Sequence, residues 1–169
     1  MLHRTALLVV VLAACAKPSS PPTAAVATIA SRSASTATGT ARVTPTAGGV
    51  TVTIAVEGAS PGDHGLHLHV TGDCSAADAT SAGDHWNPAA HAHGAPGPGV
   101  HAGDLGNITV DAGGRGTLVI TLPGLTLGGA TGVLGHAIVL HAAVDDLQSQ
   151  PAGNAGARIG CGVIVASGT

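Results

Sequence analysis

A six-residue run near the middle of the chain alternates small or aliphatic side chains with imidazoles. Residues 65–70 read Gly-Leu-His-Leu-His-Val, which places His67 and His69 two residues apart. Successive side chains of a β-strand point to opposite faces of the sheet. The run therefore predicts a strand whose Leu66 and Leu68 enter the core while both histidines lie together on the other face.

Several other short segments have the composition and period of strands. In residues 50–56 Val and Ile alternate with Thr and Ala, as expected for a half-buried strand. Residues 107–110 and 116–122 flank an Asp-Ala-Gly-Gly turn and predict a hairpin. Further strands are expected over residues 25–30, 137–141 and 159–165. With no convincing helical stretch, this series favours an all-β sandwich or barrel.

The composition limits which residue types can form the core and which class of ligand the chain can bind. The chain has 169 residues, enough for one domain, with one Trp and neither Phe nor Tyr, so its core must consist of Val, Ile, Leu and Ala. The net charge of −3 provides no basic patch, which argues against a nucleic-acid partner. Ten histidines against six Lys and Arg residues indicate metal binding instead.

The candidate ligands lie on two strands and in one of two long loops that lack periodicity, residues 73–103 and 143–157. Loops of this length without secondary structure are often functional. Six histidines and one aspartate would make two metal sites if one histidine were shared. Imidazole suits copper and zinc, a redox site needs copper, and three imidazoles with one carboxylate suit tetrahedral zinc. The candidates are His67, His69, His85, His93, His101, His141 and Asp104.

The beginning of the chain has the features of an export signal. Arg4 precedes a short apolar run, which small residues close at Cys15. Leu-Ala-Ala-Cys resembles a bacterial lipobox, in which cleavage before the cysteine precedes its lipidation. We therefore expect a lipoprotein signal peptide over residues 1–14, a flexible tether over 15–24 and one domain over 25–169. The alternative is an ordinary signal peptide with a bystander cysteine.

The count of cysteines agrees with export. Three cysteines would leave one unpaired in an exported protein, and lipidation of Cys15 removes it from the count. Cys74 and Cys161 then remain to form one disulfide in an oxidising compartment. The expected location is the cell envelope or periplasm, with the membrane contacted only through the lipid on Cys15.

Taken together, the motifs resemble those of the copper,zinc superoxide dismutases, in particular the exported bacterial type. The resemblance covers about residues 50–165 in the family's order. It is carried by the segments Gly-Leu-His-Leu-His at 65–69, Gly-Asp-His-Trp-Asn-Pro at 83–88, His-Gly at 93–94, His-Ala-Gly-Asp-Leu-Gly-Asn at 101–107, Val-Leu-His-Ala-Ala-Val-Asp-Asp-Leu at 139–147 and Gly-Asn-Ala-Gly-Ala-Arg-Ile-Gly-Cys-Gly-Val at 153–163.

The resemblance implies a fold and a role for each matching residue. The fold would be an eight-stranded Greek-key β-barrel with two long functional loops. Copper would be held by His67, His69 and His141, with His85 bridging copper to a zinc ion held by His93, His101 and Asp104. Asp145 would join His67 to His93, Arg158 would hold the anion beside copper, and Cys74 would pair with Cys161. The substrate would be superoxide, converted to O2 and H2O2, and His85 would also carry a proton.

Other readings of several of these residues remain open. The neighbouring His91 could replace His93 as a ligand, Asp145 and Asp146 could be a solvated pair, and Arg158 could be a surface charge. His64 is expected in the core, and His136 has no assigned role. The sequence does not distinguish a monomer from a homodimer.

The sequence differs from the family in the charges near the proposed copper site, and two other functions compete with the dismutase. The segment 148–152 lacks the charged residues of the family's guidance loop, and from Pro61 onward only Arg115 and Arg158 oppose eight acidic residues. We therefore expect weak electrostatic steering. A periplasmic copper- or zinc-binding protein without turnover is the alternative function, whereas the complete set of zinc ligands disfavours a copper-only dismutase.

Overall fold

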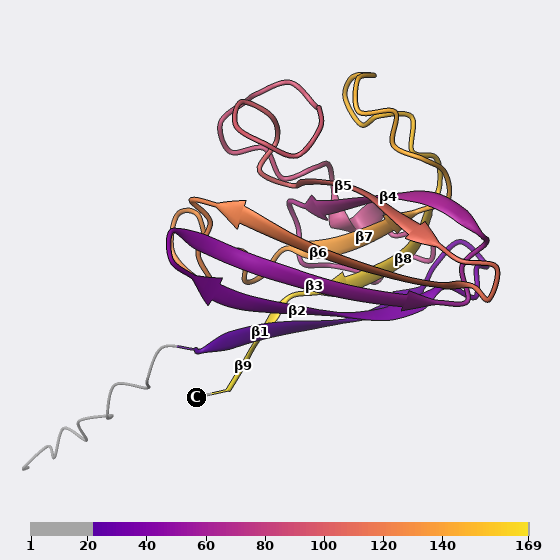
Figure 1. Ribbon diagram of the computed structural model, residues 1–169, viewed down its shortest axis with the longest axis horizontal. Coiled ribbons are helices and arrows are strands. Elements are labelled where there is room, and N and C mark those ends of the chain that lie inside the picture. Colours follow the sequence, from indigo (N-terminus) through magenta and orange to yellow (C-terminus); the bar gives the residue numbers. More distant parts are fainter. Residues whose placement is uncertain (1–21, 169) are drawn as a thin grey trace, which may run out of the picture.

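The computed structural model describes residues 22–168, which form a closed all-β barrel (Figure 1). The expected fold class is thereby confirmed. The strands are β1 (Ala24–Ser31), β2 (Thr38–Thr46), β3 (Gly49–Glu57), β4 (Gly62–His69), β5 (Asp104–Val110), β6 (Arg115–Pro123), β7 (Ala137–His141), β8 (Arg158–Val163) and β9 (Val165–Ser167). The only helix among the described residues is a 3-10 turn, Thr80–Ala82, so no helix there is long and apolar enough to cross a membrane.

The barrel has eight strands because β8 and β9 are two parts of one strand. Both pair antiparallel with β1 in the same register, and only Ile164 separates them. The order around the sheet is β2-β3-β6-β5-β4-β7-β8-β1, and pairing of β1 with β2 closes it. Strands β3 and β6 are neighbours although two strands intervene in the chain, which is the Greek-key crossover.

The core is aliphatic, as the composition requires. Alternating residues of β3, Val50, Val52, Ile54 and Val56, are buried, while Thr53 and Ala55 between them are exposed. Leu66 and Leu68 of β4 are fully buried within the same cluster. The period of two along these strands therefore places one face inside the barrel, as the sequence pattern predicted.

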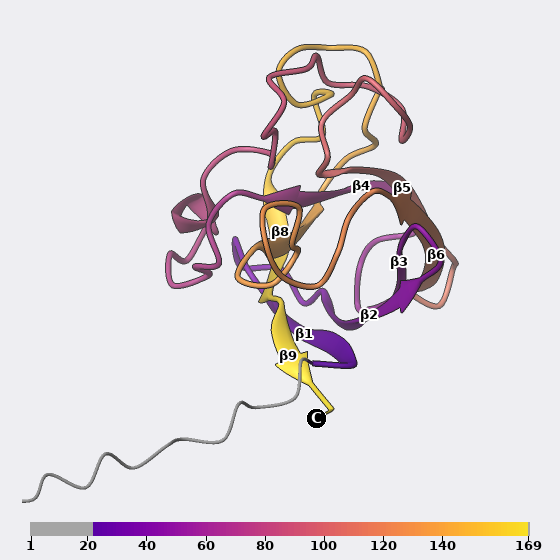
Figure 2. The same ribbon diagram turned by 90° about the vertical axis from the view of Figure 1, so that its left-hand side faces the viewer.

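The two long loops rise from one side of the barrel, and β1 and β9 lie on the opposite side (Figures 1 and 2). The first loop connects β4 to β5 and the second connects β7 to β8. The ladders near these loops are irregular, with register shifts between Gly65 and His67 and between Leu140 and His141. Bulges of this kind redirect side chains and occur often beside functional sites.

The start of the domain differs slightly from the predicted boundary. Ala24 is already part of β1, and the Thr23 backbone N–H donates to the Gly168 carbonyl at 3.1 Å. The last two residues of the segment expected to be a tether are thus fixed to the barrel. The predicted signal peptide and Cys15 lie outside the described residues.

Candidate metal centre

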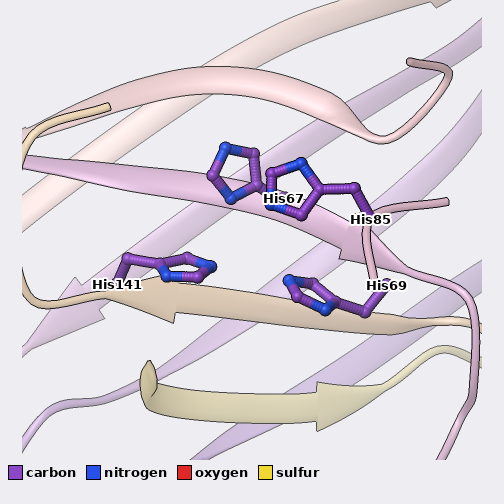
Figure 3. A group of neighbouring side chains, drawn as sticks. All are labelled: His67, His69, His85 and His141. Atoms are coloured by element: carbon purple, nitrogen blue, oxygen red, sulfur yellow. The ribbon is translucent and has the colours of Figure 1, made fainter. Parts of the chain in front are cut away.

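Four buried histidines converge between β4, β7 and the first loop (Figure 3). His67 and His69 come from β4, His141 comes from the end of β7, and His85 comes from the loop, which an isolated bridge to His69 holds beside β4. One ring nitrogen from each lies within 4.8 Å of the others. The H-x-H alternation and the parity of His141 thus place three imidazoles on one face, as predicted.

Hydrogen bonds identify which nitrogen of each ring is free. His69 Nδ1 is 2.8 Å from the Gly83 carbonyl, and His141 Nδ1 is 3.2 Å from the Gly156 carbonyl. His67 Nε2 is 2.8 Å from Asp145 Oδ2. The opposite nitrogens are buried without a partner, namely His67 Nδ1, His69 Nε2, His85 Nε2 and His141 Nε2. Buried polar atoms normally have partners, so four unpaired nitrogens in one place fit a cation-binding site.

A second cluster surrounds the carboxylate of Asp104. Its Oδ1 atom lies 3.2 Å from His85 Nδ1, 3.0 Å from His93 Nδ1 and 3.2 Å from His101 Nδ1. The contact of His101 Nδ1 lacks hydrogen-bond geometry, so this buried nitrogen has no hydrogen-bond partner. Three imidazole nitrogens and one carboxylate oxygen are a donor set that suits tetrahedral zinc.

The tautomer of His93 strengthens this conclusion. Its Nε2 lies 2.9 Å from Asp145 Oδ1, and donation to that carboxylate leaves a lone pair on Nδ1 of the neutral ring. That lone pair faces Asp104 Oδ1, which is also an acceptor. Two acceptors at 3.0 Å repel one another unless a cation or proton lies between them. The donor arrangement therefore fits a metal ion.

His85 is the residue common to both clusters through its two nitrogens. Its Nδ1 points toward Asp104, while its Nε2 is unpaired on the side of the other cluster. His67 is also close to both clusters, but Asp145 occupies its Nε2. The His67 and His85 rings stack with centroids 3.8 Å apart. Among the six histidines, the geometry therefore favours His85 as the shared ligand.

Burial favours the neutral forms of His69 and His141 in the four-histidine cluster. Burial, with a smaller contribution from the positive charge of Arg158, lowers the pKa of His69 to about 2. Burial likewise lowers the pKa of His141 to about 3, with a further contribution from His67. Neutral imidazole is the form that binds metals. At neutral pH these two rings therefore bind metal without losing a proton.

Asp145 links the two clusters, as expected from the resemblance. It accepts from His67 through one oxygen and from His93 through the other. Burial alone would raise the pKa of Asp145, but hydrogen bonds from His67, the Leu147 backbone N–H and His93 lower it to about 2. Carboxylate acceptors of this kind orient ligand imidazoles and raise their basicity.

A cleft of about 560 Å³ opens over the four-histidine cluster. Its lining includes His69, His85 and His141 together with Arg158. One nitrogen of Arg158 donates to the Ala79 carbonyl at 2.9 Å, which fixes the side chain against the first loop. Burial lowers the pKa of Arg158, whereas the negative charges of Asp84 and Asp78 raise it. An anion that enters the cleft can therefore contact the fixed, positively charged side chain of Arg158 beside the four-histidine cluster.

The remaining histidines differ in burial and in their contacts with the two clusters. His93 is buried against Asp104 and Asp145, whereas His91 is exposed and lies 3.1 Å from the Val100 carbonyl. His64 is buried in the barrel, with Nδ1 2.8 Å from the His141 carbonyl. His136 stacks on Trp86 at 4.2 Å between ring centroids. Neither His64 nor His136 belongs to the clusters.

The predicted disulfide is present and ties the first loop to the barrel. Cys74 is bonded to Cys161 of β8, 87 positions further along the sequence. Arg32 Nε donates to the Cys74 carbonyl at 2.9 Å, so the same loop is also held by β1's neighbouring turn. The sequence analysis did not identify Arg32, because a side chain that bonds a distant carbonyl leaves no periodic signal.

Two amide side chains near the clusters also escaped the sequence analysis. Asn107 donates from Nδ2 to the Asp145 carbonyl at 2.9 Å and accepts from the Asp145 N–H at 2.8 Å. Gln150 bonds the backbone of His93 in the same two-sided manner. Asn107 lies in a recognised motif, but nothing in the sequence marks Gln150.

This chain is thus an aliphatic β-barrel with adjoining sites for two metal ions, and comparison with known proteins agrees. The family model for copper/zinc superoxide dismutase matches residues 37–164. An extracellular copper-zinc superoxide dismutase from Onchocerca volvulus is 43% identical over 124 residues, which cover 68% of this chain and 61% of that protein. The crystal structure of the clock protein EA4 matches with a TM-score of 0.81 and 33% identity over 90% of this chain and 99% of the other.

The chain therefore belongs to the copper/zinc superoxide dismutase family. It spans about three fifths of the length of the Onchocerca protein.

Proposed function

We propose that this protein is a copper,zinc superoxide dismutase that converts superoxide into O2 and H2O2. The observation that carries this proposal is the pair of adjoining clusters, which share His85 and each contribute histidines to the lining of one cleft. Four unpaired imidazole nitrogens lie beside a carboxylate with three further nitrogen contacts, and His85 contributes to both. Arg158 lines the same cleft.

The two clusters suit different metals. His67, His69, His85 and His141 provide four nitrogens and no carboxylate, which suits copper. His85, His93, His101 and Asp104 provide three nitrogens and one oxygen, which suits zinc. When bound, copper alternates between two oxidation states and so accepts and returns one electron, whereas zinc has no redox chemistry and serves to hold the loop.

The chain's own residues bind the anion and supply a proton. The Arg158 guanidinium offers a positive charge and hydrogen-bond donors to a small anion in the cleft, and such bonds are stronger than neutral ones. Formation of H2O2 requires protons, and His85 Nε2, which makes no hydrogen bond to the described residues and belongs to a ring that lines the cleft, can hold one whenever it does not bind copper. Its orientation is maintained on the Nδ1 side by Asp104.

We further propose that the protein is exported and anchored by lipid at Cys15 in the manner of bacterial lipoproteins. The disulfide supports an oxidising compartment, and the Onchocerca relative is described as extracellular. Residues 1–14 would be the signal peptide, and the tether would end before Thr23. Strand β1, which would follow the tether, lies on the side of the barrel opposite the long loops (Figure 2).

Metal reconstitution with matched variants tests the two assignments. We expect one copper and one zinc per chain and superoxide dismutation by the loaded protein. His141→Ala should remove copper and activity while most zinc remains, because His141 contacts only the first cluster. Asp104→Ala should weaken zinc binding first. His91→Ala is the matched control, since that exposed ring lies in neither cluster, and it should retain both metals.

A further inference from the structure

The second long loop contacts the first through the Asp145 carboxylate and also through Gln150, an amide side chain that the proposed function does not yet use. Gln150 Oε1 accepts the His93 backbone N–H at 2.8 Å, and Gln150 Nε2 donates to the His93 carbonyl at 2.9 Å. The same Nε2 donates to the Gln148 carbonyl at 3.0 Å. Gln150 therefore pairs with both backbone polar groups of His93, much as a residue on a neighbouring strand would.

This contact converges on a residue whose side chain is already held. The His93 ring lies between Asp104 and Asp145, at 3.0 and 2.9 Å. Gln150 fixes the backbone from which that ring projects. An imidazole with both its ring and its backbone constrained has little freedom to turn away from Asp104.

The segment that carries Gln150 is internally bonded, so the contact is between two ordered units. The Asp146 carboxylate accepts the backbone N–H groups of Gln148 and Ser149 at 3.0 and 2.8 Å. Gly153 N–H donates to the Ser149 carbonyl at 2.7 Å. Gln150 also lines the cleft, beside Pro151 and Ala152. The wall of the cleft and the His93 backbone thus share one side chain.

We propose that Gln150 is a positioning residue, which holds His93 in place for zinc and couples zinc binding to the order of the cleft wall. This inference rests on the zinc site of the proposed function, but it does not require turnover. Two consequences follow. Loss of the amide should weaken zinc binding, and zinc should protect the backbone of residues 148–154 only when the amide is present.

Three substitutions separate the two hydrogen bonds from general effects on the loop. Gln150→Met keeps the length of the side chain and removes both bonds. Gln150→Glu keeps the acceptor for the His93 N–H and loses the donor to the carbonyl. Gln148→Met is the control, because the Gln148 side chain makes no hydrogen bond within residues 22–168.

Zinc affinity is measured by chelator competition on the copper-free protein with its disulfide intact. Outer partners of metal ligands typically contribute 10–100-fold in affinity, and we expect about a tenfold loss for Gln150→Met, a smaller loss for Gln150→Glu and none for Gln148→Met. Cobalt in the zinc site should show an altered visible absorption band in Gln150→Met. Hydrogen exchange should show that zinc protects residues 148–154 in the wild type and in Gln148→Met but not in Gln150→Met.

The possible failures are distinguishable. Copper affinity measured on the same Gln150→Met sample should equal that of the wild type, since His67, His69 and His141 are untouched, and this result excludes general unfolding. If wild type and Gln150→Met bind zinc equally and show equal protection, the role of Gln150 is overturned while the zinc site stands. If the wild type does not bind zinc, both the proposed function and this inference are overturned.

Discussion

The metal-free protein should lose stability steeply as the pH falls below 6.5, because His69 and His141 are buried in their neutral forms. In the folded chain burial lowers the pKa of His69 to about 2 and that of His141 to about 3, whereas both titrate near 6.5 when unfolded. Between these values the unfolded state binds more protons than the folded state, so acid favours unfolding.

The size of the effect follows from the width of that window. Each group contributes about 1.4 kcal/mol per pH unit once the unfolded histidine is protonated. Two histidines over about 1.5 pH units, from near 6.5 to near 5, give a loss of about 4 kcal/mol. This is a large part of the ~5–15 kcal/mol by which a typical domain is stable.

The shifted pKa values of His67, His93 and Asp145 do not reverse this loss of stability at low pH. Burial lowers the pKa of His67, which adds to the loss. Burial opposes protonation of His93 as well, but Asp145 and Asp104 raise its pKa overall, so His93 contributes stability at low pH and acts in the opposite sense to His67. Asp145, with its pKa lowered to about 2, stabilises the fold above 3.8 and loses that contribution only as the pH falls toward 2, outside the window.

Urea unfolding of chelator-treated protein at about pH 7 and pH 5, with the disulfide intact, measures the difference directly. The double variant His69→Gln/His141→Gln removes both titrating rings and should show a much smaller dependence on pH. A wild-type stability that changes by less than about 1 kcal/mol between the two pH values, or a double variant with the wild-type slope, would refute the reasoning.

Three further perturbations test separate parts of the structure. Arg158→Ala should lower the rate of dismutation about 10–100-fold, whereas Arg158→Lys should retain part of the rate. Pulse radiolysis of the wild type should find that the rate depends only weakly on salt, because few fixed cations line the cleft. Gly153→Ala would place a Cβ against the Asp145 carboxylate and should weaken zinc binding in a chelator titration. Gly124→Ala, also at positive φ but with nothing within 4 Å of the added atom, is its control and should retain zinc. Cys161→Ser opens a covalent link across 87 residues and should lower the free energy of unfolding by about 4–5 kcal/mol in urea titrations.

Much of the barrel was predictable because its strands repeat with a period of two. The strand expected over residues 137–141 has those bounds in the structure, and residues 50–56 lie within β3. Closure by pairing of β1 with β2 had no such signal, since the Ser- and Thr-rich residues 31–40 resemble a linker in composition. Pairing between strands depends on contacts distant in the sequence, which a local pattern does not contain.

The metal-binding clusters were also predictable from the spacing of residues in the sequence. The side chains that hold the clusters and their loops in place were not. Histidines are rare enough that their spacing on strands and their match to a family define a candidate set. Gln150 and Arg32 act through bonds to the backbone carbonyls of distant residues, so any residue type with a suitable donor could stand there without a visible motif. The stacking of His136 on Trp86 likewise depends on two segments that meet only in the fold.

The central claim is that the two adjoining clusters hold copper and zinc and support turnover of superoxide. The most direct test is to determine both metals and the rate of dismutation on one preparation of the chain. We expect one copper and one zinc per chain together with dismutation that disappears in His141→Ala. Stoichiometric binding of both metals without dismutation would contradict it and would instead identify an exported metal-binding protein.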